Sequence, residues 1–234
     1  MLKLSLGGTR FEWRLIREIL RVGAPLSLQP ILNNLGLTAL TGFAGTLGAT
    51  ALAAFGSAVR LEYLLYPMTF GFGAALLAMV GTNIGAGNFA RAARISWTAA
   101  GFAAAIASIA AAVAIFWPNV WTSLFTASPS VKAAAGTYLV VVGFAYPFVA
   151  LNTLGSAFQA MGCPQWPILV FATRFVVTIV GGWIVIHATD TGLVGLGVAT
   201  AAGLIISQVM LAIVYRAVSL RQAQRAKQIE GGVS

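Results

Sequence analysis

Charged side chains are scarce in this sequence, and acidic ones are the scarcest. The 234 residues include 14 lysines and arginines but only 5 aspartates and glutamates. A soluble domain is about one-quarter charged, whereas here the charged share is 8% and the hydrophobic share is 59%. So few charges cannot keep a water-facing globule soluble, and so apolar a chain is not disordered. The composition therefore predicts an integral membrane protein.

Side chains that carry enzyme chemistry are nearly absent as well. The lone Cys163 cannot form an intramolecular disulfide, and the lone His187 with nearby Asp190 supplies too few ligands for a metal site. The glycines of 85–87 are followed by no Lys-Ser or Lys-Thr pair, which argues against a phosphate-binding loop. We therefore expect no enzyme activity, no cofactor and no metal centre.

Long stretches without any charge indicate transmembrane helices. A helix needs about 20 mostly apolar residues to cross the hydrocarbon core. Glycine, proline, asparagine and aspartate turn signals divide the charge-free stretches into six such spans. We expect an all-α membrane domain over 22–215, with a kink at Pro67 in the second span and Pro147 inside the fourth. The six spans lie near 22–44, 51–84, 95–117, 133–158, 168–187 and 193–215.

The basic residues indicate the orientation of these spans. Five precede the first span, two follow the second and four follow the sixth, so eleven of the 14 fall on one side. The positive-inside rule makes that side cytoplasmic, with both termini on it. The net charge of +9 then needs no nucleic-acid partner, although it would attract anionic membrane lipid. Residues 1–21 indicate a cytoplasmic amphipathic linker helix or a charged lead-in to the first span, and 216–234 a basic cytoplasmic tail.

The one acidic residue within a span is Glu62, which lies near mid-membrane. Ionisable groups are costly there and usually mark a partner or a transport pathway. One interpretation is an ion pair with Arg174 or Arg60 that stabilises the bundle. The other is that Glu62 takes up a proton or a cation in a central cavity.

Amide side chains within the spans are further candidates. Gln29, Asn33 and Asn34 lie in the first span near Pro30, and Asn152 lies in the fourth span near Pro147. Such amides form hydrogen bonds between helices. They can also bind a cation or a polar substrate, together with backbone groups freed by a proline. Both interpretations remain open from the sequence.

Residues 79–92, MVGTNIGAGNFARA, resemble the motif VGQN-x-GAGN-x-x-RA of the MATE family of multidrug and toxic compound extrusion transporters. Other stretches resemble the second half of these proteins in the same order: RVGAP at 21–25, AAFG at 53–56, RLE at 60–62 and AFQAMG at 157–162. Thr82 departs from the glutamine of the motif. The residues that match the motif are Gly81, Asn83, Gly85, Gly87, Asn88 and Arg91.

The resemblance implies one six-helix lobe, the carboxy-terminal one, of a two-lobed transporter of the MOP superfamily. It implies export of small cationic amphipathic compounds from the bacterial inner membrane by alternating access, coupled to entry of H⁺ or Na⁺. The partner would be an amino-terminal lobe or a second copy of the chain. Some members carry cation-binding carboxylates at the positions of Asn33 and Val149, so coupling here would depend on Glu62 or on the other lobe.

Two other functions remain open at this point. The chain could be a truncated or accessory membrane fragment that transports nothing by itself. It could also be a lipid-linked saccharide flippase of the same superfamily, for which we expect a more basic cavity than one built from Glu62, Asn33 and Asn34.

Overall fold

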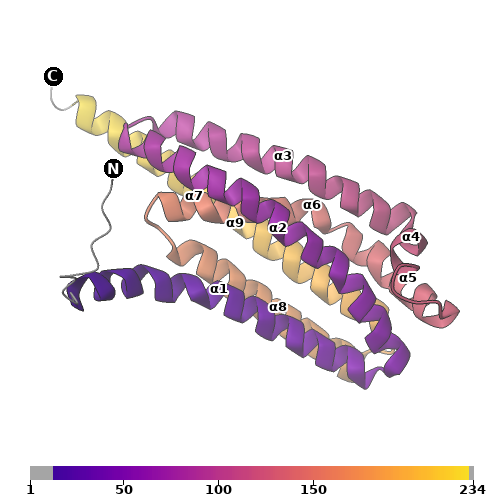
Figure 1. The fold of residues 1–234 in the computed structure, drawn as a ribbon. Helices are drawn as coiled ribbons and strands as arrows, with labels where there is room; N and C mark the ends of the chain where they lie inside the picture. The colour runs from indigo at the N-terminus through magenta and orange to yellow at the C-terminus, as the bar shows by residue number, and fades with distance from the viewer. Residues whose placement is uncertain (1–12, 232–234) are drawn as a thin grey trace, which may run out of the picture.

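The computed structural model describes the backbone of residues 13–231, with some side chains near both ends of this range left out. All of its regular elements in that range are helices, and they form one elongated bundle (Figure 1). In chain order they are α1 (Trp13–Thr46), α2 (Ala49–Gly85), α3 (Phe89–Phe116), α4 (Pro118–Thr122), α5 (Pro129–Gly143), α6 (Tyr146–Val149), the 3₁₀ helix η1 (Ala150–Asn152), α7 (Thr153–Ala160), α8 (Gln165–Ala188) and α9 (Gly192–Gly231).

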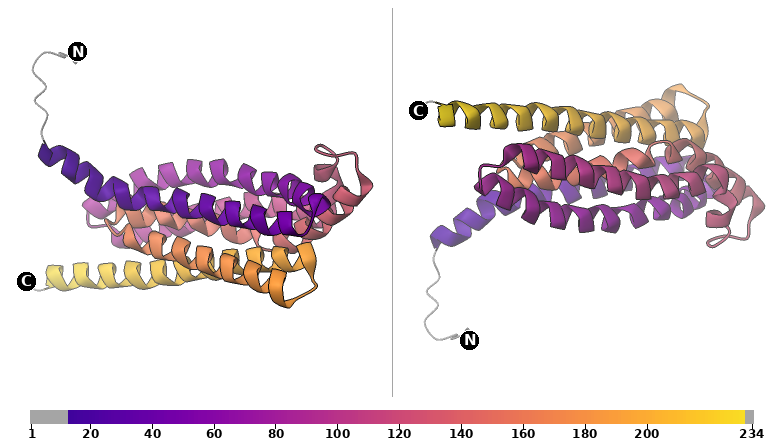
Figure 2. Two further views of the ribbon diagram at one scale, coloured as in Figure 1. Left: turned by 90° about the horizontal axis from the view of Figure 1, so that it is seen from below. Right: turned by 90° about the horizontal axis from the view of Figure 1, so that it is seen from above.

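Four of these helices, α2, α3, α8 and α9, are each long and apolar enough to cross a membrane. The bent pair formed by Pro129–Gly143 and Tyr146–Ala160 gives a fifth span if it is counted as one. Within the described residues, helix length and apolarity therefore do not confirm the expected count of six spans. The first span is the one missing: α1 has 34 residues but carries amides at 29, 33 and 34. It still lies beside α2 and α8 within the bundle (Figures 1 and 2).

The fourth span is bent rather than straight. Its two halves meet at 55°, with the break at residues 144–145. Pro147 explains the position, because it has no N–H to donate to the carbonyl of Gly143 and its ring disfavours a helical residue before it. α2 continues through Pro67 without a break, as a single helix of 37 residues. At 1.5 Å per residue α2 is about 55 Å long, so it must tilt or project beyond the hydrocarbon core.

The expected boundaries at residues 21 and 216 both fall inside continuous helices. α1 begins at Trp13 in the described range and runs without a break into the first expected span. The remainder of the expected linker, 1–12, lies outside the described residues. At the other end, α9 continues to Gly231, so the basic segment after 216 prolongs the sixth expected span as a helix.

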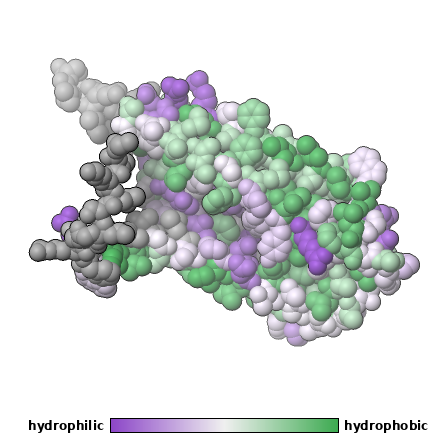
Figure 3. All heavy atoms as spheres, viewed as in Figure 1, coloured by the Kyte–Doolittle hydropathy of each residue, from purple (hydrophilic) through white to green (hydrophobic). Residues whose placement is uncertain are grey.

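Small side chains allow the helices to approach one another closely. The buried face of α3 is a stripe of alanines and one serine: Ala92, Ser96, Ala100, Ala103, Ala107, Ala111 and Ala114. Where α5 crosses this stripe, a Cβ added at Gly143 would lie 3.1 Å from the Cβ of Ala114. The outer surface is largely hydrophobic instead (Figure 3), as expected for contact with lipid.

Candidate ion-coupling site

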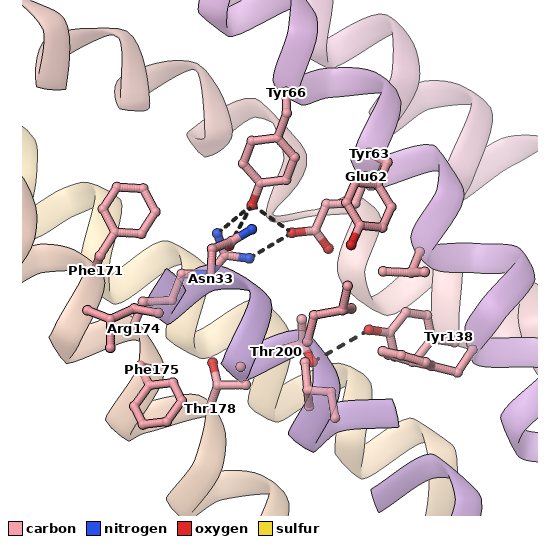
Figure 4. A pocket seen from close by; sticks show the side chains of 16 residues that line it. Asn33, Glu62, Tyr63, Tyr66, Tyr138, Phe171, Arg174, Phe175, Thr178 and Thr200 are labelled. Atoms are coloured by element: carbon pink, nitrogen blue, oxygen red, sulfur yellow. Dashed lines mark hydrogen bonds and ion pairs between the residues drawn. The ribbon is translucent and has the colours of Figure 1, made fainter. Parts of the chain in front are cut away.

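A cavity lies where α1, α2 and α8 converge, with α5 and α9 closing it from behind (Figure 4). Asn33 of α1, Glu62 and Tyr66 of α2, and Arg174 of α8 point toward one another in this cavity. The rest of the lining is largely apolar and includes Phe55, Phe171 and Phe175. The only acidic side chain of the expected spans therefore faces a small polar space in an apolar bundle.

Glu62 and Arg174 form an ion pair in this space. Nη2 of Arg174 donates to Oε1 of Glu62 at 2.7 Å, and Nη1 donates to the hydroxyl of Tyr66 at 2.8 Å. The side chains of Arg174 and Glu62 are only 14% and 9% exposed. An unpaired charge at such a site would be costly, so each member stabilises the charged form of the other. The pairing of Glu62 with Arg174, one of the two alternatives considered, is the one present.

Tyr66 links the ion pair to α1. Its hydroxyl lies 3.3 Å from Oε1 of Glu62 and 3.3 Å from Oδ1 of Asn33, so its single proton can go to either oxygen. Both hydrogen bonds of the carboxylate therefore involve Oε1. The other oxygen, Oε2, makes no hydrogen bond to the described residues. The carboxylate thus keeps one oxygen that a proton or an ion could reach.

The size of the cavity limits what it can hold. Its volume is about 40 Å³, whereas sites for drug-sized molecules are about 300–1,000 Å³. A space of this size suits one or a few water molecules or a small ion. The hydroxyls of Thr178 and Thr200 are also on its wall. The described residues contain no group of three or more His, Cys, Asp or Glu side chains that could hold a metal ion.

Arg60, the other expected partner of Glu62, does not reach it. Positions two apart on a helix point in different directions, and Arg60 is exposed on the outer side of α2. Its guanidinium carbon lies 4.7 Å above the centre of the Phe125 ring, a cation–π contact.

The other candidate amides are not part of the cavity lining. Gln29 is one helical turn before Asn33, and its Nε2 is buried with no hydrogen-bond partner in the described part of the chain. Asn34 is exposed, and its Nδ2 donates to the carbonyl of Pro30 at 2.8 Å. Asn152 is half-buried in η1, within the bent fourth span. Of the candidate amides, the structure brings only Asn33 to the ion pair.

The motif at 79–92 forms the turn between α2 and α3. Gly87 has φ = +76°, a conformation that favours glycine, and the N–H of Asn88 donates to the carbonyl of Asn83 at 2.8 Å. Gly81 and Gly85 lie in the last turns of α2, and Arg91 is exposed in the first turn of α3. The motif therefore shapes a helix connection away from the cavity.

Several polar residues of the cavity were not predicted from the sequence, among them Tyr66, Thr178 and Thr200. A signal for the first two was present, because Tyr66 is four residues after Glu62 and Thr178 is four residues after Arg174. Side chains four apart share one face of a helix. Nothing comparable marks Thr200, whose position depends on how α9 packs against α5 and α8.

Comparisons with known proteins agree with this fold. The MatE family model matches residues 25–184. A probable multidrug resistance protein NorM of Neisseria meningitidis is 24% identical over 204 residues, which are 86% of this chain and 44% of that protein.

Solved structures are similar over the whole bundle. A MATE crystal structure in the straight conformation has a TM-score of 0.85 at 21% identity, covering 95% of this chain and 51% of that chain. The MATE transporter ClbM in complex with Rb⁺ has a TM-score of 0.79 at 25% identity, with coverage of 92% and 51%. The chain thus spans about half the length of the proteins that it matches. Because the family model covers most of its residues, the chain belongs to the MatE family of membrane transporters.

Proposed function

We propose that this chain is the carboxy-terminal six-helix lobe of a cation-coupled exporter of cationic amphipathic compounds in the bacterial inner membrane. The observation that carries the proposal is the extent of the structural similarity: 95% of this chain superimposes on 51% of a MATE chain. One lobe of a two-lobed transporter would match a relative in this way, because it would correspond to about half of that relative's length. Alternating access then requires a second lobe, supplied by an amino-terminal half or by a second copy of this chain.

The coupling ion that the cavity favours is H⁺. Arg174 stays protonated in proteins, so the pair with Glu62 is already neutral before any ion arrives. A Na⁺ at Oε2 would have to sit beside this guanidinium and gather several oxygen ligands in about 40 Å³. A proton needs only the one free oxygen. ClbM was solved with Rb⁺, so a monovalent metal ion is the alternative that the experiment must separate from H⁺.

Protonation of Glu62 would act on the packing of α2 against α8. The neutral carboxyl loses most of its attraction for Arg174, which is left charged in a largely apolar space. The guanidinium would then draw toward water, and the contacts that tie α8 to α2 and, through Tyr66, to α1 would loosen. The exported compound itself is too large for this cavity and would bind between the two lobes.

The test is efflux of a cationic dye from cells that produce this chain alone, or together with an amino-terminal MATE lobe supplied as a separate chain. We expect efflux only when both halves are present, driven by a pH gradient and unaffected by Na⁺. Efflux by the chain alone would favour a homodimer. Absence of efflux in both cases, with both halves inserted in the membrane, would contradict the proposal and favour an inactive accessory fragment or a flippase.

A further inference from the structure

A second hollow lies on the outside of the bundle, between the end of α2 and the start of α3. It is an open groove of about 830 Å³, and it shares no lining residue with the ion-pair cavity. Its apolar wall includes Phe72, Leu76 and Met79 of α2 and Ile95 and Phe102 of α3. Met79 and Phe102 are 50% and 64% exposed, so this wall is not covered by another part of the described chain.

Two arginines stand at one end of this groove. Arg91 and Arg94 are three residues apart on α3, so they share a side of the helix. Both are exposed, and neither has a hydrogen bond or an ion pair with any described residue. The acidic side chains that the structure describes are elsewhere: Glu62 is paired inside the bundle, and Asp190 lies in the α8–α9 connection at the other end (Figure 1). Among the side chains that the structure describes, none therefore compensates the charge at this end of the groove.

The order of charge and apolar surface along the groove matches one kind of ligand. From Arg91 to Phe102 the helix rises about 16 Å, and the lining changes from two guanidiniums to apolar side chains. We propose that this groove binds an anionic phospholipid, with the phosphate on Arg91 and Arg94 and an acyl chain along Phe72, Met79 and Phe102. The exported cations that we propose above would be repelled by the arginines, so the groove is not their route.

Lipid binding in this groove would give a function to the motif at 79–92, which takes no part in the ion pair. Met79, Gly87, Asn88 and Arg91 belong both to the motif and to the groove lining. A lipid held there would contact α2 and α3 together, and it would stabilise the turn that joins them. The proposed lipid site rests on the groove and its charge alone, so a failure of ion coupling at Glu62 would not contradict it.

The purified protein is exposed either to phosphatidylglycerol or to phosphatidylcholine with the same acyl chains. Native mass spectrometry then measures how much of each lipid the protein retains. We expect the wild type to retain phosphatidylglycerol preferentially, and R91Q/R94Q to lose roughly 10- to 30-fold in that preference. The matched control is R216Q/R221Q, which removes two exposed arginines of α9 outside the groove and should leave the preference unchanged.

A second variant separates the acyl site from a simple phosphate site. Ala75→Trp fills the groove from an exposed position of α2 and keeps both arginines, and it should also abolish retention. Equal losses in R91Q/R94Q and R216Q/R221Q would overturn the proposal in favour of diffuse attraction to a basic surface. Retention that survives Ala75→Trp, or displacement of the lipid by glycerol 3-phosphate, would overturn it in favour of a free phosphate.

Discussion

Glu62 is the acidic side chain buried inside this apolar bundle, and its ion pair with Arg174 leads to a specific prediction. In a chain produced with its partner lobe, Glu62→Gln should abolish proton-driven efflux of a cationic dye and leave membrane insertion intact. It also leaves Arg174 buried without its counter-charge, which should lower the free energy of unfolding by about 3–5 kcal/mol. Efflux assays and thermal unfolding in detergent measure the two effects.

Two further variants separate coupling from stability at this pair. The double substitution Glu62→Gln/Arg174→Gln removes both charges, so it should recover most of the lost stability but none of the efflux. Arg60→Gln, two residues away and exposed over Phe125, is the matched control and should change neither quantity beyond about 0.5 kcal/mol. If the double variant is stable and still exports the dye in a pH-dependent way, Glu62 is only a structural residue.

At the scale of the elements, α5 lies in close contact with α3 just before the bend of the fourth span. A Cβ at Gly143 would lie 2.9 Å from Cγ1 of Ile115 and 3.1 Å from Cβ of Ala114. Gly143→Ala should therefore force these helices apart and cost about 1–3 kcal/mol, although alanine is the better helix former. Gly101→Ala on α3, with nothing within 4 Å, should be neutral or stabilising by up to about 1 kcal/mol. A Gly143→Ala variant as stable as Gly101→Ala would show that this contact is not tight.

The same elements show how far the sequence alone could be interpreted. Glycine, proline and asparagine signals predicted the connections after α1, α2, α3, α7 and α8 to within a few residues, because these turns are determined by local chemistry. The bend was not predictable in this way. Pro67 and Pro147 carry the same local signal, yet the helix breaks only near Pro147. Likewise, the sequence left both Arg60 and Arg174 open as partners of Glu62, because the meeting of Glu62 with Arg174 depends on how α8 packs in the bundle.

For the whole molecule, the number of crossings is the open structural question. The described start of α1 and the end of α9 lie at the same end of the bundle (Figures 1 and 2). An even number of crossings has this property, so we expect α1 to cross along with the five apolar spans. Two of its three amides can be tolerated because Asn33 faces the internal cavity and Asn34 bonds its own backbone. The bundle thus favours six spans where hydropathy alone gives up to five.

Single-cysteine labelling can decide the topology, since Cys163 is the only cysteine to remove first. In a Cys163→Ser background, a membrane-impermeant maleimide added to intact cells should label Thr46→Cys and Ala127→Cys, which we place outside. It should not label Ser5→Cys or Arg221→Cys until the cells are opened, because the positive-inside rule predicts a cytoplasmic location for the side with eleven of the 14 basic residues. Labelling of Ser5→Cys from outside would mean that α1 does not cross, and would leave Asn33 and its contact with Tyr66 without a membrane-embedded role.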